Sequence, residues 1–269
     1  MKKNKKIDLG ILIFIPILTA IVSLIYQENF LISTILFFGA PSLYLAVRHK
    51  NALKKTFLFS LLFSVPLTFI FDYLIAKDKG WYIVSSIFSF RIFNIVVVEQ
   101  FIWAFLWIFY IVIFYEYFLD KQEKRSIFSF FSKTNTAITK PMEHFALFMF
   151  ALLSFFIFFA YFSPTFLKID YSYLALGTIF GIIPLSIFLF KFPNFSVRFS
   201  KATLYFLFLA FVIEYVGLKL NHWTFPGTHF IGMASFFGFL IPYEEIMIYF
   251  VLSTPAVLSY YEFFDDDRR

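Results

Sequence analysis

The sequence predicts an all-α polytopic membrane protein with eight transmembrane helices, arranged as two parallel four-helix repeats with both termini in the cytoplasm. Composition, the number of long apolar stretches and the placement of basic residues support this prediction. Of the 269 residues, 61% are hydrophobic and 15% are charged, whereas a soluble domain has about 45–50% apolar and about 25% charged residues. One globular core cannot enclose such an excess of apolar side chains, so we expect most of the chain to lie in a bilayer.

Eight apolar stretches are long enough to cross the membrane, since a helix needs roughly 20 residues to span ~30 Å of hydrocarbon. Polar or Pro- and Gly-containing segments separate the stretches, which are 9–26, 30–47, 56–76, 95–119, 142–163, 171–190, 201–219 and 238–261. The first has a basic start but no small-residue cleavage site, so we expect a retained helix and not a signal peptide.

Basic residues alternate between the segments that join these stretches. With the N-terminus inside, the cytoplasmic segments contain 18 of the 23 Lys and Arg residues, and the outer segments contain Lys77, Lys79, Arg91, Lys168 and Lys219. This is the asymmetry of the positive-inside rule, and a miscounted helix would disturb it. The net charge of +6 reflects these cytoplasmic basic residues and does not indicate a nucleic-acid partner. We therefore expect a multi-pass protein of the cell membrane.

Acidic and aromatic residues recur in the second half at the spacings of the first. A Trp follows an acid by nine residues twice (Asp72 to Trp81, Glu214 to Trp223), and a Glu follows a Glu by seventeen residues twice (Glu99 to Glu116, Glu245 to Glu262). Four helices per unit is an even number, so both units would enter the membrane in the same sense. We therefore expect a first repeat over 1–119, a basic cytoplasmic linker over 120–141 and a second repeat over 142–269.

Carboxylates are costly inside hydrocarbon, by at least about 2.5–3.5 kcal/mol each, so each one is a candidate for function. Five lie near the predicted outer ends of four helices: Asp72, Glu99, Glu214, Glu244 and Glu245. We expect them to form one site, with half supplied by each repeat. Because adjacent carboxylates in a dry site repel one another, one of the Glu244–Glu245 pair is expected to keep a proton and act as an acid. The alternatives are solvation at a helix end and interaction with a helix dipole.

Other titratable residues fit this site less well. Glu116 and Glu262 lie ~25 Å from the outer acids along their helices, and each has an Asp four residues on (Asp120, Asp266). Bonds to basic cytoplasmic loops are expected there, with a magnesium or diphosphate site as the alternative. Cysteine is absent, and the histidines, His49, His144, His222 and His229, lack ligand spacing, so we predict no metal site. Trp81 and Trp223 either line the site or belong to an interfacial aromatic belt.

One run of residues in the second repeat resembles the repeated unit of the heterodimeric-type, non-flavin lycopene cyclases. It consists of Glu214-Tyr215, Trp223, Gly232, Pro242-Tyr243-Glu244-Glu245, Tyr249-Phe250, Pro255 and Tyr261-Glu262. A more divergent copy is formed by Asp72-Tyr73, Trp81, Glu99, Trp103 and Tyr115-Glu116, where Val96-Val97-Val98-Glu99-Gln100 replaces the Pro-x-Glu-Glu motif. The resemblance covers roughly residues 56–120 and 200–265.

The resemblance implies an intramolecular lyase or isomerase of carotenoid biosynthesis. Such an enzyme cyclises the end of lycopene or a related linear carotene in the membrane, through a carbocation and without redox change. Glu244 and Glu245 would be the acid and base, supported by Glu214, Asp72 and Glu99. The polyene would contact Trp81, Trp223, Trp103, Tyr249 and Tyr215.

No cofactor is expected, and no Gly-x-Gly-x-x-Gly fingerprint is present. The partners would be a lipophilic polyene and membrane lipid. Three alternatives remain open at this stage. They are a carotenoid hydratase acting on the same double bond, an intramembrane prenyltransferase and a small proton-coupled transporter.

Overall fold

Helices make up most of the molecule. The computed structural model describes residues 3–120 and 140–265 and is 77% helical. Within these ranges, eight helical segments are long and apolar enough to cross a membrane: Asn4–Tyr26, Phe30–Arg48, Lys50–Lys77, Val98–Phe118, Glu143–Phe162, Ser172–Lys191, Pro193–Lys219 and Glu245–Phe264. The eight predicted spans are thus confirmed as helices. Most of the predicted linker lies outside the described residues.

Each half of the chain contains four of these segments. The elements of the first half are α1 (Lys3–Tyr26), α2 (Phe30–Thr34), η1 (Ile35–Gly39), α3 (Ala40–Arg48), η2 (Lys50–Ala52), α4 (Leu53–Lys77), β1 (Tyr82–Ile83), β2 (Arg91–Ile92), β3 (Val96–Val97) and α5 (Val98–Phe118). In the second half they are α7 (Lys140–Phe162), η3 (Pro164–Leu167), α8 (Ser172–Leu176), η4 (Gly177–Ile182), α9 (Ile183–Lys191), η5 (Pro193–Phe195), α10 (Ser196–Lys219), β4 (Trp223–Thr224), β5 (Met233–Phe236), β6 (Phe239–Pro242), η6 (Glu245–Leu252) and α11 (Ser253–Asp265).

Two segments contain a π-helical turn just before a proline. η1 precedes Pro41 near the start of α3, and η4 precedes Pro184 near the start of α9. Proline has no N–H to donate and its ring crowds the carbonyl four residues back, so the turn before it widens. Each segment then ends at a basic residue, Arg48 or Lys191, and a short 3-10 turn leads into the next long helix.

Strands replace helix at the start of the eighth predicted span. Residues 238–244 were expected to be helical, but β6 occupies Phe239–Pro242 and pairs with β5 in an antiparallel hairpin. Pro242 ends this strand, where its missing N–H costs no helical hydrogen bond. The third and seventh segments begin earlier than predicted, at Lys50 and Pro193, because η2 and η5 extend them.

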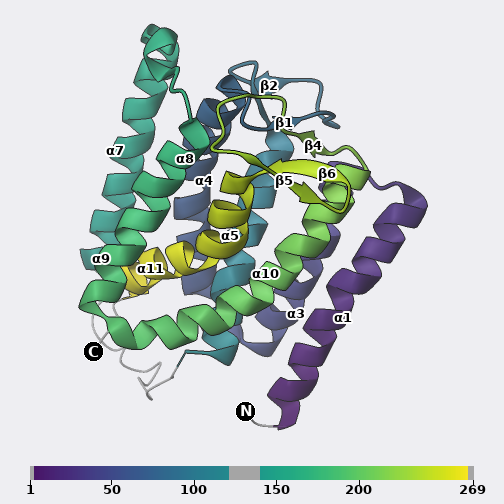
Figure 1. The fold of residues 1–269 in the computed structure, drawn as a ribbon. Helices are drawn as coiled ribbons and strands as arrows, with labels where there is room; N and C mark the ends of the chain where they lie inside the picture. The colour runs from purple at the N-terminus through teal and green to yellow at the C-terminus, as the bar shows by residue number, and fades with distance from the viewer. Residues whose placement is uncertain (1–2, 121–139, 266–269) are drawn as a thin grey trace.

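All six short strands lie at one end of the helical bundle, which we call the strand end (Figure 1). The described chain begins and ends at the opposite end, which we call the terminal end. β1 pairs with β4 in antiparallel register, with Ile83 opposite Trp223, and thereby joins the two halves of the chain. The His222 side chain contacts the Glu28 carbonyl through Nε2 at 2.8 Å and ties this ribbon to the α1–α2 turn.

Helix α5 passes through the middle of the bundle, with α1 on one flank and α7, α8 and α9 on the other (Figure 1). Residues 107–115 of α5 are all buried. α1 is the least enclosed of the first four spans. It is held by Asp8, whose fully buried carboxylate accepts hydrogen bonds from Tyr44 and Tyr117 and pairs with Arg48 at 2.9 Å.

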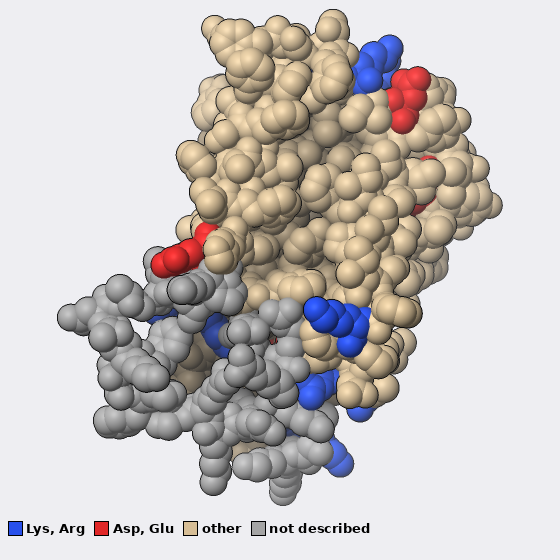
Figure 2. Space-filling model, turned by 90° about the vertical axis from the view of Figure 1, so that its left-hand side faces the viewer, with Lys and Arg blue, Asp and Glu red and all other residues tan. Residues whose placement is uncertain are grey.

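The flank formed by the later helices has the charge pattern of a membrane protein. Figure 2 shows Lys and Arg side chains gathered towards the two ends and an almost uncharged surface between them. Large exposed apolar side chains occupy this flank, among them Phe150, Phe158 and Phe190, which is 94% exposed. Such a surface is stable against lipid tails and not against water.

Candidate functional site

A cavity of about 210 Å³ lies inside the bundle, bounded by α4, α5, η4, α10, η6 and α11. Its lining is almost wholly apolar and aromatic, and it includes all four tryptophans of the chain: Trp81, Trp103, Trp107 and Trp223. Three carboxylates interrupt this lining, from Asp72, Glu214 and Glu245. No Lys, Arg or His from the described ranges lines the cavity. The three acids therefore have no basic partner on its walls.

Glu214 lies on α10 and is fully buried. The Trp223 indole donates a hydrogen bond to Glu214 Oε1 at 3.0 Å, while Oε2 has no hydrogen-bond partner within residues 3–120 and 140–265. Gly217 makes this arrangement possible, because a Cβ at that position would overlap the Trp223 ring. The two residues of the nine-residue spacing, Glu214 and Trp223, are thus joined by a hydrogen bond that holds β4 against the end of α10.

Glu245 is the first residue of η6 and is 5% exposed. Its Oε2 accepts a hydrogen bond of 2.6 Å from the Tyr173 hydroxyl on α8. The Glu214 and Glu245 carboxylates are near enough to each other to interact electrostatically. Two like charges at close range in a dry site are unfavourable, so ionisation of one carboxyl group opposes ionisation of the other.

Asp72 on α4 is the third acid of the cavity, and it is 6% exposed. The Gln100 amide donates a hydrogen bond to Asp72 Oδ1 at 3.1 Å, and Trp81 is a second side-chain partner. The other amide atom, Gln100 Oε1, is buried without a partner from the described residues. Asp72 and Gln100 thus form a pair similar to Glu214 and Glu245 in the second half. Each pair consists of an acid on a long helix and a residue at the start of the next span.

Aromatic rings of the cavity lining pack against one another in two groups. Tyr249 packs against Trp103 and Trp107, with ring centroids 5.5 and 5.2 Å apart. Trp81 meets Tyr173 edge-on at 5.0 Å. All five rings line the cavity, and the faces of aromatic rings attract cations.

Three residues predicted for the site lie outside the cavity lining. The Glu99 carboxylate accepts hydrogen bonds from Ser86 Oγ and from the Ile87 N–H, and Glu244 accepts one from the Ile231 N–H. Both therefore hold the loops of the strand end. Tyr215 packs beside Phe237 and Phe239. The structure thus brings together three of the five predicted acids, and four of the five predicted aromatic residues: Trp81, Trp103, Trp223 and Tyr249.

The acids of the terminal end form a separate cluster. Tyr115 donates to Glu262 and Tyr261 donates to Glu116, each at 2.5 Å, so that each tyrosine bonds to the glutamate of the other half. Lys55 pairs with Glu116 at 2.7 Å and Arg198 with Asp120 at 3.7 Å. The predicted bonds between these acids and basic segments are therefore present for Glu116 and Asp120. Asp266 lies outside the described residues.

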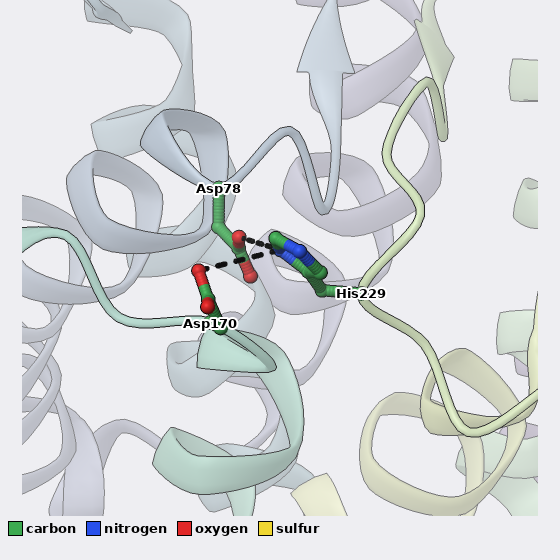
Figure 3. A group of neighbouring side chains, drawn as sticks. All are labelled: Asp78, Asp170 and His229. Carbon is green, nitrogen blue, oxygen red and sulfur yellow. Dashed lines mark hydrogen bonds and ion pairs between the residues drawn. The ribbon is translucent and has the colours of Figure 1, made fainter.

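A third cluster joins three loops near the strand end (Figure 3). His229 Nδ1 contacts Asp78 Oδ1 at 2.5 Å and Asp170 Oδ1 at 3.6 Å. This hydrogen bond with Asp78 raises the pKa of His229 above its ordinary value of 6.5. The ligand atoms lie within 4.8 Å of one another, so these residues could hold a metal ion. The sequence did not indicate this group, because its members are 92 and 59 residues apart.

No protein-family model matches the chain, and no curated protein or solved structure matches it either.

Sequence reasoning missed several residues of the cavity. Gln100 follows Glu99 directly. If the two halves are aligned with a shift of one residue, Gln100 and not Glu99 matches Glu245. Tyr173, which donates to Glu245, begins the sixth span and has no distinctive spacing to any acid. Its role depends on the packing of α8 against η6, which no local pattern reports.

Proposed function

We propose that the chain is a carotenoid end-group cyclase, which converts a linear carotene such as lycopene into a cyclic isomer inside the membrane. The observation that carries this proposal is the cavity. It places three buried carboxylates at one end of an apolar space that all four tryptophans line. Such a space suits a hydrocarbon substrate, and its polar groups are of the kind that move protons.

The chemistry needs two proton transfers and no oxidant. A carboxylic acid gives its proton to the terminal carbon–carbon double bond, which leaves a tertiary cation and a carboxylate. The next internal double bond attacks the cation and closes the ring, with the positive charge now on a ring carbon. A carboxylate then removes a proton from a neighbouring carbon to form the new double bond. Substrate and product are isomers, so no cofactor is needed.

Glu214 and Glu245 are the best candidates for the acid. They interact electrostatically, and single neutral donors, Trp223 and Tyr173, orient them. Asp72 belongs to the other half of the chain, where Gln100 orients it, and it is the candidate for the base. In this proposal Glu99 and Glu244 act through the loops that they hold. The acid or base role predicted for Glu244 and the supporting role predicted for Glu99 pass to the residues that line the cavity.

The proposal includes an internal duplication. α3 and α9 have the same length, each follows a π-helix, and each is followed by a 3-10 turn, a long helix, a short strand and a hairpin. Glu99 and Glu244 each bind the loop before them, which pairs Gln100 with Glu245. The π-helix η6 supplies the extra residue that then brings Tyr115-Glu116 into register with Tyr261-Glu262. In this proposed alignment Glu244 corresponds to Glu99, and Glu245 corresponds to Gln100.

The proposed orientation in the cell membrane follows the basic residues. Lys5, Arg48, Lys55 and Lys191 belong to the terminal end, which would face the cytoplasm with both termini. The acids of the cavity would then lie near the outer face. Glycosylation-site or thiol-accessibility mapping of the loops checks this orientation.

The experiment that tests the function uses cells that accumulate lycopene. The full chain is expressed in them, and the pigments are separated by chromatography and examined by absorption. A product with cyclic ends and the mass of lycopene supports the proposal. A product heavier by one water identifies a hydratase. Unchanged lycopene, with the protein verified in the membrane, overturns both functions for this substrate.

The Glu245→Gln variant tests the acid. It preserves the shape of the side chain and removes the transferable proton, so we expect product formation to fall by about 10²–10⁴-fold. The matched control is Glu143→Gln on α7, where the glutamate is exposed and distant from the cavity. Full activity of Glu245→Gln would remove this residue from the mechanism.

A further inference from the structure

The cavity is elongated along the helices. It extends from Asp72 back to Phe63 on α4, ~14 Å at the rise of an α-helix, and from Glu245 to Tyr260 on η6 and α11. Phe63 and Tyr260 meet at its lower end with ring centroids 4.8 Å apart. The acids occupy one end of a slot and aromatic rings close the other.

Helix η4 borders this slot with two glycines that differ in their surroundings. A Cβ at Gly177 would overlap Ile248 of η6, so the two helices are in close contact there. One turn later, a Cβ at Gly181 would meet nothing within 4 Å, although Gly181 also lines the cavity and is partly exposed. The wall of the slot is therefore closed at Gly177 and thin at Gly181.

Aromatic residues frame the thin part of the wall. Phe180 packs edge-on against Phe71 of α4 at 5.6 Å, and the Tyr260 hydroxyl donates to the Phe180 carbonyl at 3.0 Å. The surface outside it is apolar, with Ile179 and Ile183 exposed on either side in sequence. An apolar chain that leaves the slot here meets these apolar side chains.

We propose that Gly181 forms a lateral opening of the cavity, through which a long acyclic apolar chain enters from the bilayer and lies lengthwise in the slot. The head of the chain reaches the acids while its tail stays in lipid. Gly181 is then a specificity-determining residue, because any side chain at this position narrows the opening. This inference rests on the proposed function for the identity of the chain as a linear polyene.

Tryptophan fluorescence measures occupancy of the slot without catalysis. Because all four tryptophans line the cavity, a bound polyene that absorbs their emission quenches the whole intrinsic signal. We expect lycopene, added in detergent, to quench the wild-type protein with saturation. In Gly181→Phe the apparent Kd should rise at least about tenfold, as expected when a filled space must be repacked.

Gly10→Phe is the matched control. Gly10 lies on the exposed surface of α1, a Cβ there would also meet nothing within 4 Å, and the residue does not line the cavity. Its apparent Kd should stay within about twofold of wild type. Equal affinity of Gly181→Phe and wild type overturns the lateral opening and leaves the proposed function standing. Absence of saturable quenching in the wild type overturns the proposed function and this inference together.

A second measurement does not depend on folding of the phenylalanine variant. The chain has no cysteine, so Gly181→Cys and Gly10→Cys each introduce a single thiol. After purification, saturating lycopene should slow N-ethylmaleimide labelling of Gly181→Cys at least about fivefold and leave that of Gly10→Cys unchanged. Equal labelling rates with and without lycopene in Gly181→Cys, under conditions where quenching shows binding, would overturn the placement of the opening.

Discussion

At the scale of single residues, the cavity acids depend on neutral donors. Trp223, Tyr173 and Gln100 each contribute one hydrogen bond to a different carboxylate, and no basic side chain from the described ranges lines the space. Hydrogen bonds of this kind orient a carboxyl group without fixing its charge as a lysine or arginine would. An acid that must give up a proton and take one back benefits from such surroundings.

Tyr173→Phe tests this dependence with little change in volume. The variant removes the 2.6 Å hydrogen bond to Glu245 and leaves the ring that packs against Trp81. We expect the proposed carotene cyclisation to fall by roughly tenfold to a hundredfold, because Glu245 loses its orientation and one stabilising bond, worth about 1.5–3 kcal/mol when an ionised group is involved. Tyr161→Phe, at a tyrosine that is 74% exposed, is the control. Equal activity of the two variants would show that Tyr173 does not position Glu245.

The His229–Asp78 pair predicts a pH-dependent loop. Since the pKa of His229 is raised above 6.5 by its bond to Asp78, the protonated pair stabilises the folded loop fully below that value. The contribution is lost as the pH rises through the raised pKa of the folded state. Once exchange rates are corrected for the intrinsic base-catalysed rate, which rises with pH in any chain, the protection of residues 225–232 should therefore fall as the pH rises above 6.5. His229→Gln should remove most of this fall. An unchanged pH profile in the variant would show that another group governs the loop.

At the scale of elements, η6 is the most informative segment. It is an eight-residue π-helix, and it begins at Glu245, the acid that faces the cavity. A wide turn at this point carries Glu245 and Tyr249 to the cavity wall while Glu244 turns to the Ile231 N–H. The two adjacent glutamates therefore have different surroundings: Glu245 lines the cavity and Glu244 binds the loop. The sequence motif alone could not have separated them, because a regular helix from residue 238 onward was the simplest expectation.

Deleting Met247 tests the need for the π-helix. Met247 is 44% exposed, and loss of one residue from a π-turn returns it to α-helical geometry. The contacts of α11 at the terminal end should survive, whereas Glu245 should turn by about one residue, or 100°, away from Tyr173. We expect a folded protein, judged by thermal unfolding in detergent, that lacks the proposed cyclase activity. Retained activity would show that the π-helix does not place the acid.

At the scale of the whole molecule, composition and charge predicted the membrane helices well. Apolar side chains on every helix follow from lipid as the surrounding solvent, so the number of spans could be read from hydropathy. The strand pairing at the strand end could not be read from hydropathy. β1 and β4 are two residues each and pair across 142 positions of sequence, and hydropathy does not distinguish such ribbons from loops.

The candidate site was predictable only in part, for a similar reason. Asp72 and Glu214 were evident because a carboxylate in an apolar helix is conspicuous, and their spacing to Trp81 and Trp223 corresponds to direct partnership. The direction in which Glu99 or Glu244 points depends on the loops above them. The choice between facing a cavity and holding a loop is made by tertiary packing.

The hydrogen bonds of Tyr115 with Glu262 and of Tyr261 with Glu116 should couple the evolution of positions that are 147 and 145 residues apart. A substitution at either tyrosine removes a hydrogen-bond donor from a glutamate in the opposite half. The loss of stability therefore arises partly in the half that was not changed. Changes in one half are then tolerated only alongside matching changes in the other. Within a set of homologues, these four positions should vary together or not at all, and either half taken from a distant homologue should fail to replace its counterpart.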